Sequence, residues 1–139
     1  MIQSYRDLEV WKRSLLLITD IYQATRRLPP DERFGLMSQM RRAAVSIPCN
    51  IAEGYGRATR GEYLNHLSFA RGSLNEVETL CVVCRALGFL DDADLKPVDD
   101  HLDQLRRMLG RLRIRLKKSK RAKGWAGRGS IWQEGNRVS

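Results

Sequence analysis

The strongest pattern in this sequence is an apolar repeat over residues 95–116, in which the spacing alternates between three and four residues. The repeat consists of Leu95, Val98, Leu102, Leu105, Leu109, Leu112 and Leu116. A helix with this spacing presents all of these side chains on one face, and a strict heptad favours shallow crossing with neighbouring helices. Because such a stripe must be covered by other apolar surfaces, the repeat predicts a bundle of long helices.

Three further segments show helical periodicity, over residues 5–28, 34–53 and 61–87, and no segment shows a strand pattern. The predicted core face of the first segment consists of Leu8, Trp11, Leu15, Ile18 and Tyr22. That of the second consists of Leu36, Met40, Ala43, Ile47 and Ile51. That of the third consists of Leu67, Ala70, Leu74, Val77, Cys81 and Cys84. The spacings of three and four place each set on one side of a helix.

The boundaries between these segments carry residues that begin and end helices. Thr59 and Glu62 match a capping box at the start of the third segment. Gly54 is expected to cap the end of the second helix with a positive φ, and Gly88 to end the third. The connections are short, which makes successive helices antiparallel. The fold prediction is therefore an all-α protein, an antiparallel up-down-up-down four-helix bundle.

The first segment has more apolar surface than one bundle requires. Val10, Leu17 and Ile21 lie outside its predicted core face. A helix in a single bundle needs only one apolar stripe. We therefore expect these three side chains to be buried against another copy of the chain, which makes the protein a homo-oligomer.

Positive charge is concentrated at the C-terminal end of the chain. Of the net charge of +9, residues 117–139 carry +6, from seven basic residues and Glu134. This last segment has little apolar content and no period, so we expect a four-helix bundle over residues 1–116 and a disordered basic C-terminal tail over residues 117–139. Eleven basic residues and no acid lie between Arg106 and Arg128.

Such a concentration of charge indicates an anionic partner, with nucleic acid favoured. The predicted nucleic-acid-binding residues are Arg106, Arg107, Arg111, Arg113, Arg115, Lys117, Lys118, Lys120, Arg121, Lys123, Trp125 and Arg128. Their cations would contact phosphates, and the indole would stack on bases. The alternative is a solvated, disordered end with no binding role.

A second set of polar residues lies in the middle of the chain. Its members are Arg42, Ser46, Asn50 and Glu53 on the second helix, with Ser73 and Glu76 on the third. The four residues of the second helix are spaced so that they share one face. They form either a solvated face or a buried polar network that fixes the register of the two helices. Both interpretations stay open, and neither implies catalysis.

No catalytic, cofactor-binding or metal-binding motif is present. The three cysteines include one lone C-x-x-C, at Cys81 and Cys84, and a structural zinc site would need a second pair. The only two histidines lack the Glu-x-x-His spacing of a di-iron bundle. No apolar run is long enough for a membrane span, and no signal segment is visible. We expect a cytoplasmic protein that is not an enzyme, with no cofactor and no membrane association.

Three stretches resemble a known family. They are the run from Gln39 to Gly54, which reads QMRRAAVSIPCNIAEG, the run ARGSLNE from Ala70 to Glu76, and YRDLEVW from Tyr5 to Trp11. Together they resemble the four-helix-bundle family of 23S rRNA intervening-sequence proteins, which includes the Avd accessory proteins of diversity-generating retroelements. The resemblance covers residues 4–116 approximately and leaves out the tail.

The resemblance implies an antiparallel four-helix bundle that assembles as a homopentamer around a central channel. Avd-like members are nucleic-acid-binding partners of a reverse transcriptase, whereas many relatives have no assigned role. The expected function is therefore a non-enzymatic oligomeric bundle that binds nucleic acid, RNA above all, through a basic surface and tail. The alternatives are a protein-interaction scaffold for a partner such as a reverse transcriptase, or a conserved cytosolic protein of unassigned role.

Overall fold

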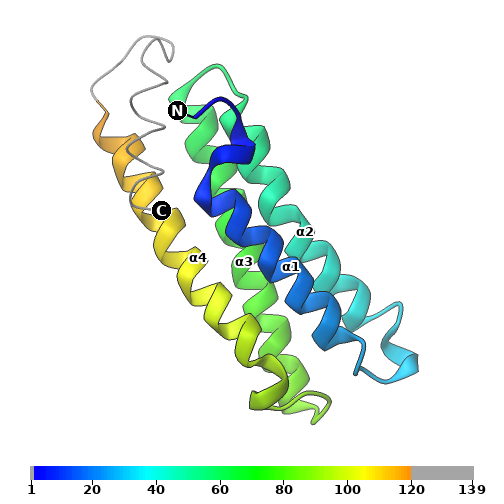
Figure 1. Cartoon of the computed structure of the whole chain (residues 1–139). Coiled ribbons are helices and arrows are strands. Elements are labelled where there is room, and N and C mark those ends of the chain that lie inside the picture. The colour runs from blue at the N-terminus through cyan, green and yellow to red at the C-terminus, as the bar shows by residue number, and fades with distance from the viewer. Residues whose placement is uncertain (1, 120–139) are drawn as a thin grey trace.

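The structure, a computed structural model, describes residues 2–119, and this part of the chain is helical without strands (Figure 1). Its four long helices are α1 (Glu9–Thr25), α2 (Leu36–Tyr55), α3 (Arg60–Ala86) and α4 (Asp92–Lys118). Short 3-10 helices, η1 (Tyr5–Asp7) and η2 (Pro30–Glu32), precede α1 and α2. The predicted number and order of helices are confirmed.

The helices form a closed ring of neighbours in which α1 packs against α2 and α4, and α3 packs against the same two helices. Each helix runs antiparallel to the next, so the predicted up-down-up-down topology is confirmed (Figure 1). The α1–α2 and α3–α4 connections lie at one end of the bundle. The N-terminal segment, the α2–α3 connection and the end of α4 lie at the other end. We call this second end the basic pole, because the last turns of α4 carry Arg115, Lys117 and Lys118 there.

Capping residues fix where the helices begin. Thr59 and Glu62 form the predicted box at the start of α3, with the Thr59 hydroxyl accepting from the Glu62 N–H at 3.1 Å. Asp91 and Asp94 form an equivalent box at the start of α4. Gly88 follows α3 with a φ of 74°, a conformation that glycine adopts without the strain of a Cβ. Its predicted role at the end of the third helix is confirmed.

Gly54 has a different role from the predicted one. It lies inside α2, which continues to Tyr55, and its φ is not positive. A Cβ at this position would lie 2.7 Å from Tyr63 Cδ1 and 2.9 Å from His66 Cβ, both on α3. The prediction of a C-terminal cap was therefore wrong, and the glycine instead lets α2 and α3 approach each other closely.

The apolar stripes of the last three helices form the core as predicted. All seven members of the α4 repeat are buried, and Leu105 and Leu109 are fully inaccessible. The stripes of α2 and α3 are also buried, apart from the partly buried Leu36. Cys81 and Cys84 belong to this core, where burial raises the pKa of the Cys81 thiol to about 12. Their predicted role as small core residues is confirmed.

The predicted core face of the first helix was only partly correct, because Leu8 is buried and Trp11 and Ile18 pack half-buried against the core, but Leu15 and Tyr22 do not belong to it. The buried face contains Val10, Leu17 and Ile21, each no more than 1% exposed, whereas Leu15 is 40% and Tyr22 38% exposed. The residues that we expected to contact another subunit thus lie inside the bundle. The apolar stripe that remains on the outside of α1 consists of Leu15, Leu16 and Tyr22, with Trp11 and Ile18 half-buried beside them. We call these five residues the outer α1 stripe.

Two polar side chains explain why the buried face of α1 was not recognised. Ser14 and Thr25 are fully buried on this face and interrupt its apolar pattern. The Ser14 hydroxyl donates to the Trp11 carbonyl at 2.6 Å, and the Thr25 hydroxyl donates to the Ile21 carbonyl at 2.7 Å. Because both hydroxyls are satisfied within their own helix, burying them carries little penalty.

Candidate nucleic-acid interface

The predicted basic residues of α4 divide into a compensated and an uncompensated group. Arg106 donates to Glu78 Oε2 at 2.9 Å and to Asn75 Oδ1 at 2.8 Å, both on α3. Arg107 forms an ion pair with Asp103, one turn earlier on α4. These two cations therefore have acidic partners already, although the stretch from Arg106 to Arg128 contains no acid.

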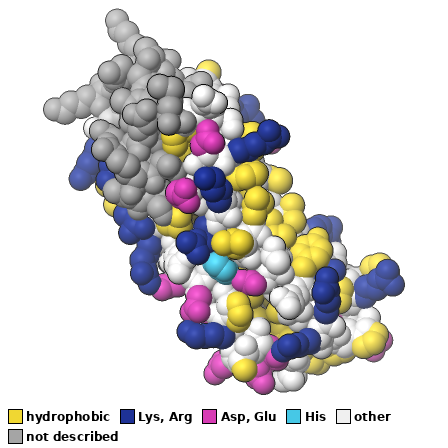
Figure 2. Space-filling model, viewed as in Figure 1, with side chains coloured by type: hydrophobic (Ala, Val, Ile, Leu, Met, Phe, Trp, Pro, Cys, Tyr) yellow, Lys and Arg dark blue, Asp and Glu magenta, His cyan; other side chains and the backbone are white. Residues whose placement is uncertain are grey.

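The uncompensated group occupies the last turns of α4. It consists of Arg111, Arg115, Lys117 and Lys118, and no carboxylate within residues 2–119 lies within ion-pair distance of any of them. Figure 2 shows basic side chains along the edge of the molecule that α4 forms. Cations at the C-terminal end of a helix also interact favourably with its dipole, so this group stabilises α4 as well.

Arg113 lies between these residues but points to α3. It is half-buried, and its Nη2 donates to the Ser68 hydroxyl at 3.1 Å. Its Nε is buried without a hydrogen-bond partner in the described part of the chain. Burial, and next the positive charge of Arg71 on α3, lower the pKa of the Arg113 guanidinium. Arg71 thus adds a second positive charge near Arg113.

The basic pole also includes residues of α3 that the sequence did not identify. Arg71 interacts with Arg113, and Arg60 at the start of α3 donates to the carbonyl of Ser119, just after α4. Both are far from α4 in the sequence, and only the antiparallel packing of α3 and α4 brings them to the same end. The remaining predicted residues, Lys120, Arg121, Lys123, Trp125 and Arg128, lie outside the described residues. The predicted start of the disordered tail at residue 117 was wrong, because Lys117 and Lys118 belong to the last turn of α4. The predicted tail from residue 120 onward lies outside the described residues.

The second predicted set is brought together only in part. Ser46 and Ser73 hydrogen bond between α2 and α3, and Asn50 donates to the Ser46 carbonyl at 2.9 Å. His66, which the sequence did not identify, links this group to Glu53, because its Nδ1 lies 3.3 Å from Asn50 Oδ1 and 3.3 Å from Glu53 Oε2. Arg42 and Glu76 are exposed and have no polar partner within residues 2–119. The network is thus half-buried and smaller than the predicted one.

The described residues offer no cluster of three or more His, Cys, Asp or Glu side chains that could hold a metal ion. The two histidines lie apart, His66 beside Glu53 and His101 with its Nε2 3.1 Å from Asp20 Oδ2. No described helix is both long enough and apolar enough to cross a bilayer.

The family resemblance is supported by a direct comparison. The sequence model of the family described as 23S rRNA-intervening sequence protein matches residues 6–111, from η1 to the last turns of α4. No curated protein matches the chain significantly. The matched region contains α1, α2 and α3 and most of α4, including the run from Gln39 to Gly54 that positions α2 against α3. The chain therefore belongs to the 23S rRNA-intervening sequence protein family.

Proposed function

We propose that this protein is a non-enzymatic, homo-oligomeric helical bundle that binds nucleic acid through the basic pole and the residues that follow it. The observation that carries the proposal is the uncompensated group, Arg111, Arg115, Lys117 and Lys118. These cations are free to neutralise phosphates, and each phosphate contact releases counterions from the nucleic acid. The family description names an intervening sequence of 23S rRNA, so RNA is the first ligand to test.

The pole provides charge without a means of reading bases. Arg60, Arg71 and Arg113 widen the cationic surface toward α3, but among residues 2–119 no helix presents a row of base-reading amides there. We therefore expect affinity that depends steeply on salt and little on sequence.

The outer α1 stripe supports the oligomeric part of the proposal. Figure 2 shows hydrophobic side chains gathered on the side of the molecule that α1 and α2 form. An apolar surface of this kind is typical of a contact between proteins, and the family resemblance makes a homopentamer the expected assembly. Leu15→Glu with Leu16→Glu should reduce the mass measured by light scattering to that of a monomer, without loss of helix by circular dichroism. An unchanged mass would contradict this contact.

The RNA-binding test compares two double variants that each remove two charges from α4. Arg111→Ala with Arg115→Ala removes uncompensated cations, and Arg106→Ala with Arg107→Ala removes compensated ones. In a gel-shift series with increasing salt, the first variant should bind RNA at least tenfold more weakly, and its slope of log affinity against log salt should fall by roughly 1.5. The second variant should stay within a factor of about three of the unmodified protein.

Equal losses in the two variants would overturn the assignment of binding to the uncompensated group. Deletion of residues 120–139 tests the tail in the same assay, and it should weaken binding further because those residues add basic charge. If the shortened chain binds RNA as tightly as the full chain, the tail has no part in binding.

A second candidate function is a scaffold that binds a protein partner, such as a reverse transcriptase, through the outer α1 stripe. The exposure of Leu15 and Leu16, 40% and 50%, favours it. Apolar contacts persist at high salt, whereas contacts between exposed charges are screened within a few ångströms. A specific complex that survives at about 0.5 M salt and is lost in the Leu15→Glu, Leu16→Glu variant would support the scaffold.

A further inference from the structure

A groove at the end of the bundle opposite the basic pole is lined by arginine and aromatic side chains. It has a volume of about 760 Å³ and follows the outer face of α2 from the α1–α2 connection to Cys49. Its charged residues are Arg33, Arg41 and Arg42, and no acid of residues 2–119 lines it. Its volume lies within the range of roughly 300–1,000 Å³ that is typical of ligand sites. We call it the arginine groove.

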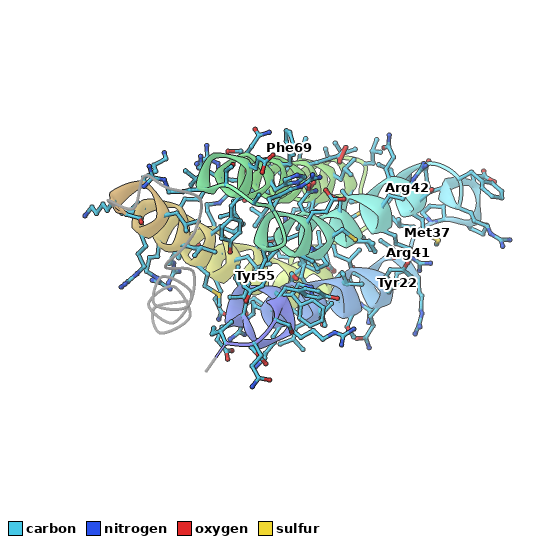
Figure 3. The ribbon with its side chains drawn as sticks, turned by 90° about the horizontal axis from the view of Figure 1, so that it is seen from above. Tyr22, Met37, Arg41, Arg42, Tyr55 and Phe69 are labelled. Carbon is cyan, nitrogen blue, oxygen red and sulfur yellow. The ribbon has the colours of Figure 1, made fainter. Side chains whose placement is uncertain are left out.

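Arg41 is held in a fixed orientation by neutral groups. Its guanidinium lies over the Tyr22 ring, 4.3 Å from the centroid. Its Nε donates to the Thr25 hydroxyl at 2.9 Å, and its Nη2 donates to the Tyr22 carbonyl at 3.2 Å. Figure 3 shows Arg41 beside Tyr22, with Arg42 and Met37 at the same end of α2. The positive charge of Arg41 is therefore oriented, and no carboxylate in the described part of the chain compensates it.

Arg33 and Phe34 form a second cation–aromatic pair at the mouth of the groove. The Arg33 guanidinium lies 5.5 Å from the centroid of the Phe34 ring, which is 87% exposed. The neighbouring acid, Glu32, does not line the groove, because its carboxylate accepts from the Leu36 N–H at 3.1 Å at the start of α2. Arg42 is exposed and has no partner in the described chain.

From these contacts we infer that the arginine groove is a second nucleic-acid site, which takes a short single-stranded segment with its phosphates on Arg33 and Arg42 and a base on Phe34. The inference rests on the proposed function for the class of ligand but not for the place, since Arg33 and Phe34 lie before the start of α2, whose 20 residues reach the other end about 30 Å away. Single-stranded nucleic acid combines phosphates with flat rings, and grooves that bind it combine cations with aromatic platforms. An acidic peptide would use the arginines but leave the exposed Phe34 ring without a stacking partner.

Cys49 makes this groove directly testable. It lines the groove and is exposed, whereas Cys81 and Cys84 are buried. Iodoacetamide is uncharged, so its rate of reaction with Cys49 reports access to the groove. We expect a saturating uridine decanucleotide to slow the alkylation of Cys49 in the full chain at least fivefold, as measured by mass spectrometry of the Cys49 peptide.

Variants then test which residues bind the decanucleotide. Arg33→Ala with Phe34→Ala should raise the decanucleotide concentration needed for half-protection of Cys49 at least fivefold, because stacking on an aromatic ring contributes strongly to single-strand binding. The control is Arg26→Ala, which removes an exposed arginine at the end of α1 that does not line the groove. It should leave the protection unchanged, as should Arg111→Ala with Arg115→Ala at saturating decanucleotide.

Each other outcome overturns the inference in a distinguishable way. If only the Arg111, Arg115 variant abolishes protection of Cys49, the decanucleotide binds at the basic pole, and the proposed function stands without the groove. If a glutamate decapeptide protects Cys49 as well as the decanucleotide does, the groove binds acidic chains in general. If Cys49 becomes protected without any decanucleotide as protein concentration rises, a second copy of the chain covers the groove.

Discussion

The helix α3 contacts its two neighbours in different ways. Against α2, a glycine brings the backbones together, and polar side chains such as Ser46 and Ser73 hydrogen bond across the contact. On the α4 side, large apolar side chains such as Leu109 fill the core, and ion pairs such as that of Arg106 with Glu78 lie at its rim. The α2–α3 contact is therefore destabilised mainly when a side chain becomes larger. The α4 stripe is destabilised mainly when an apolar side chain becomes smaller and leaves a cavity.

Truncating the α4 stripe should have the largest effect on stability. Leu109→Ala removes a fully buried side chain and leaves a cavity, so the free energy of unfolding should fall by about 3 kcal/mol. Ile114→Ala is the control, because Ile114 lies on the same helix but is 53% exposed, and its effect should stay below about 0.5 kcal/mol. Urea denaturation of the two variants measures both values. Equal losses would mean that α4 does not bury its leucine face in solution.

Enlarging a glycine should have opposite effects in the two regions. Gly54→Ala places a Cβ 2.7 Å from Tyr63 Cδ1, and overpacking of this kind destabilises by about 2 kcal/mol. Gly110→Ala on α4 meets no atom within 4 Å, so the better helix propensity of alanine should stabilise the protein by roughly 0.5–1 kcal/mol. Thermal unfolding of both variants tests the contrast, which disappears if the two midpoints shift in the same direction.

Alkaline pH should destabilise the protein through Cys81, which lies on the side of α3 that faces α4. Burial, and next the charge of Asp99 on α4, raise the pKa of this thiol from 9.0 to about 12. The contribution of the protonated Cys81 thiol to the free energy of unfolding is complete below pH 9. It is lost as pH rises toward 12, because the thiol ionises at a lower pH in the unfolded chain than in the folded one. The loss of unfolding free energy between pH 8 and pH 10 should therefore be about 1 kcal/mol smaller in Cys81→Ala than in the unmodified protein.

Comparing the two pH values within each variant removes the effect of the smaller side chain and of other titrating groups, including Tyr63. Cys49→Ala is the matched control, because Cys49 is exposed. The Cys49→Ala variant should lose as much unfolding free energy between pH 8 and pH 10 as the unmodified protein does. If both cysteine variants behave alike, the alkaline loss does not come from the buried thiol.

The smallest expected effect concerns the polar side of the α2–α3 contact. Ser73→Ala removes the hydroxyl that pairs with Ser46, but Ser46 keeps its hydrogen bond to the Ala43 carbonyl at 2.8 Å. The loss in unfolding free energy should therefore be about 0.5–1 kcal/mol. Glu76→Ala, one turn away and exposed, should leave stability unchanged within about 0.5 kcal/mol. A larger loss of unfolding free energy for Glu76→Ala would mean that Glu76 does belong to the polar network.

The sequence was sufficient for the number, order and direction of the helices, because the spacing of apolar residues and the caps are local properties. It was not sufficient for the orientation of α1. Both sides of this helix are apolar, and the buried side contains Ser14 and Thr25, so periodicity favoured the outer stripe. Only packing against α2 and α4 determines which side is covered.

The candidate site was predictable only where the contacts are local. Asp103 lies four residues before Arg107 on the same helix, so their ion pair could have been recognised. Glu78, which compensates Arg106, is 28 residues away on α3, and its position depends on the register of two helices. The arginine groove could not be predicted for the same reason, because the contact of Tyr22 with Arg41 exists only after α1 and α2 have packed.

The hydrogen bond from Arg60 to Ser119 has a practical consequence. It ties the exit of α4 to the start of α3, at the end of the bundle where the N-terminal segment also lies. A fusion partner or an affinity tag at the N-terminus would therefore crowd the basic pole and leave the arginine groove facing outward. A sensor surface that holds the protein by its N-terminus would then favour binding at the groove over binding at the pole. Attachment through an introduced cysteine midway along α3 would present both surfaces to the ligand.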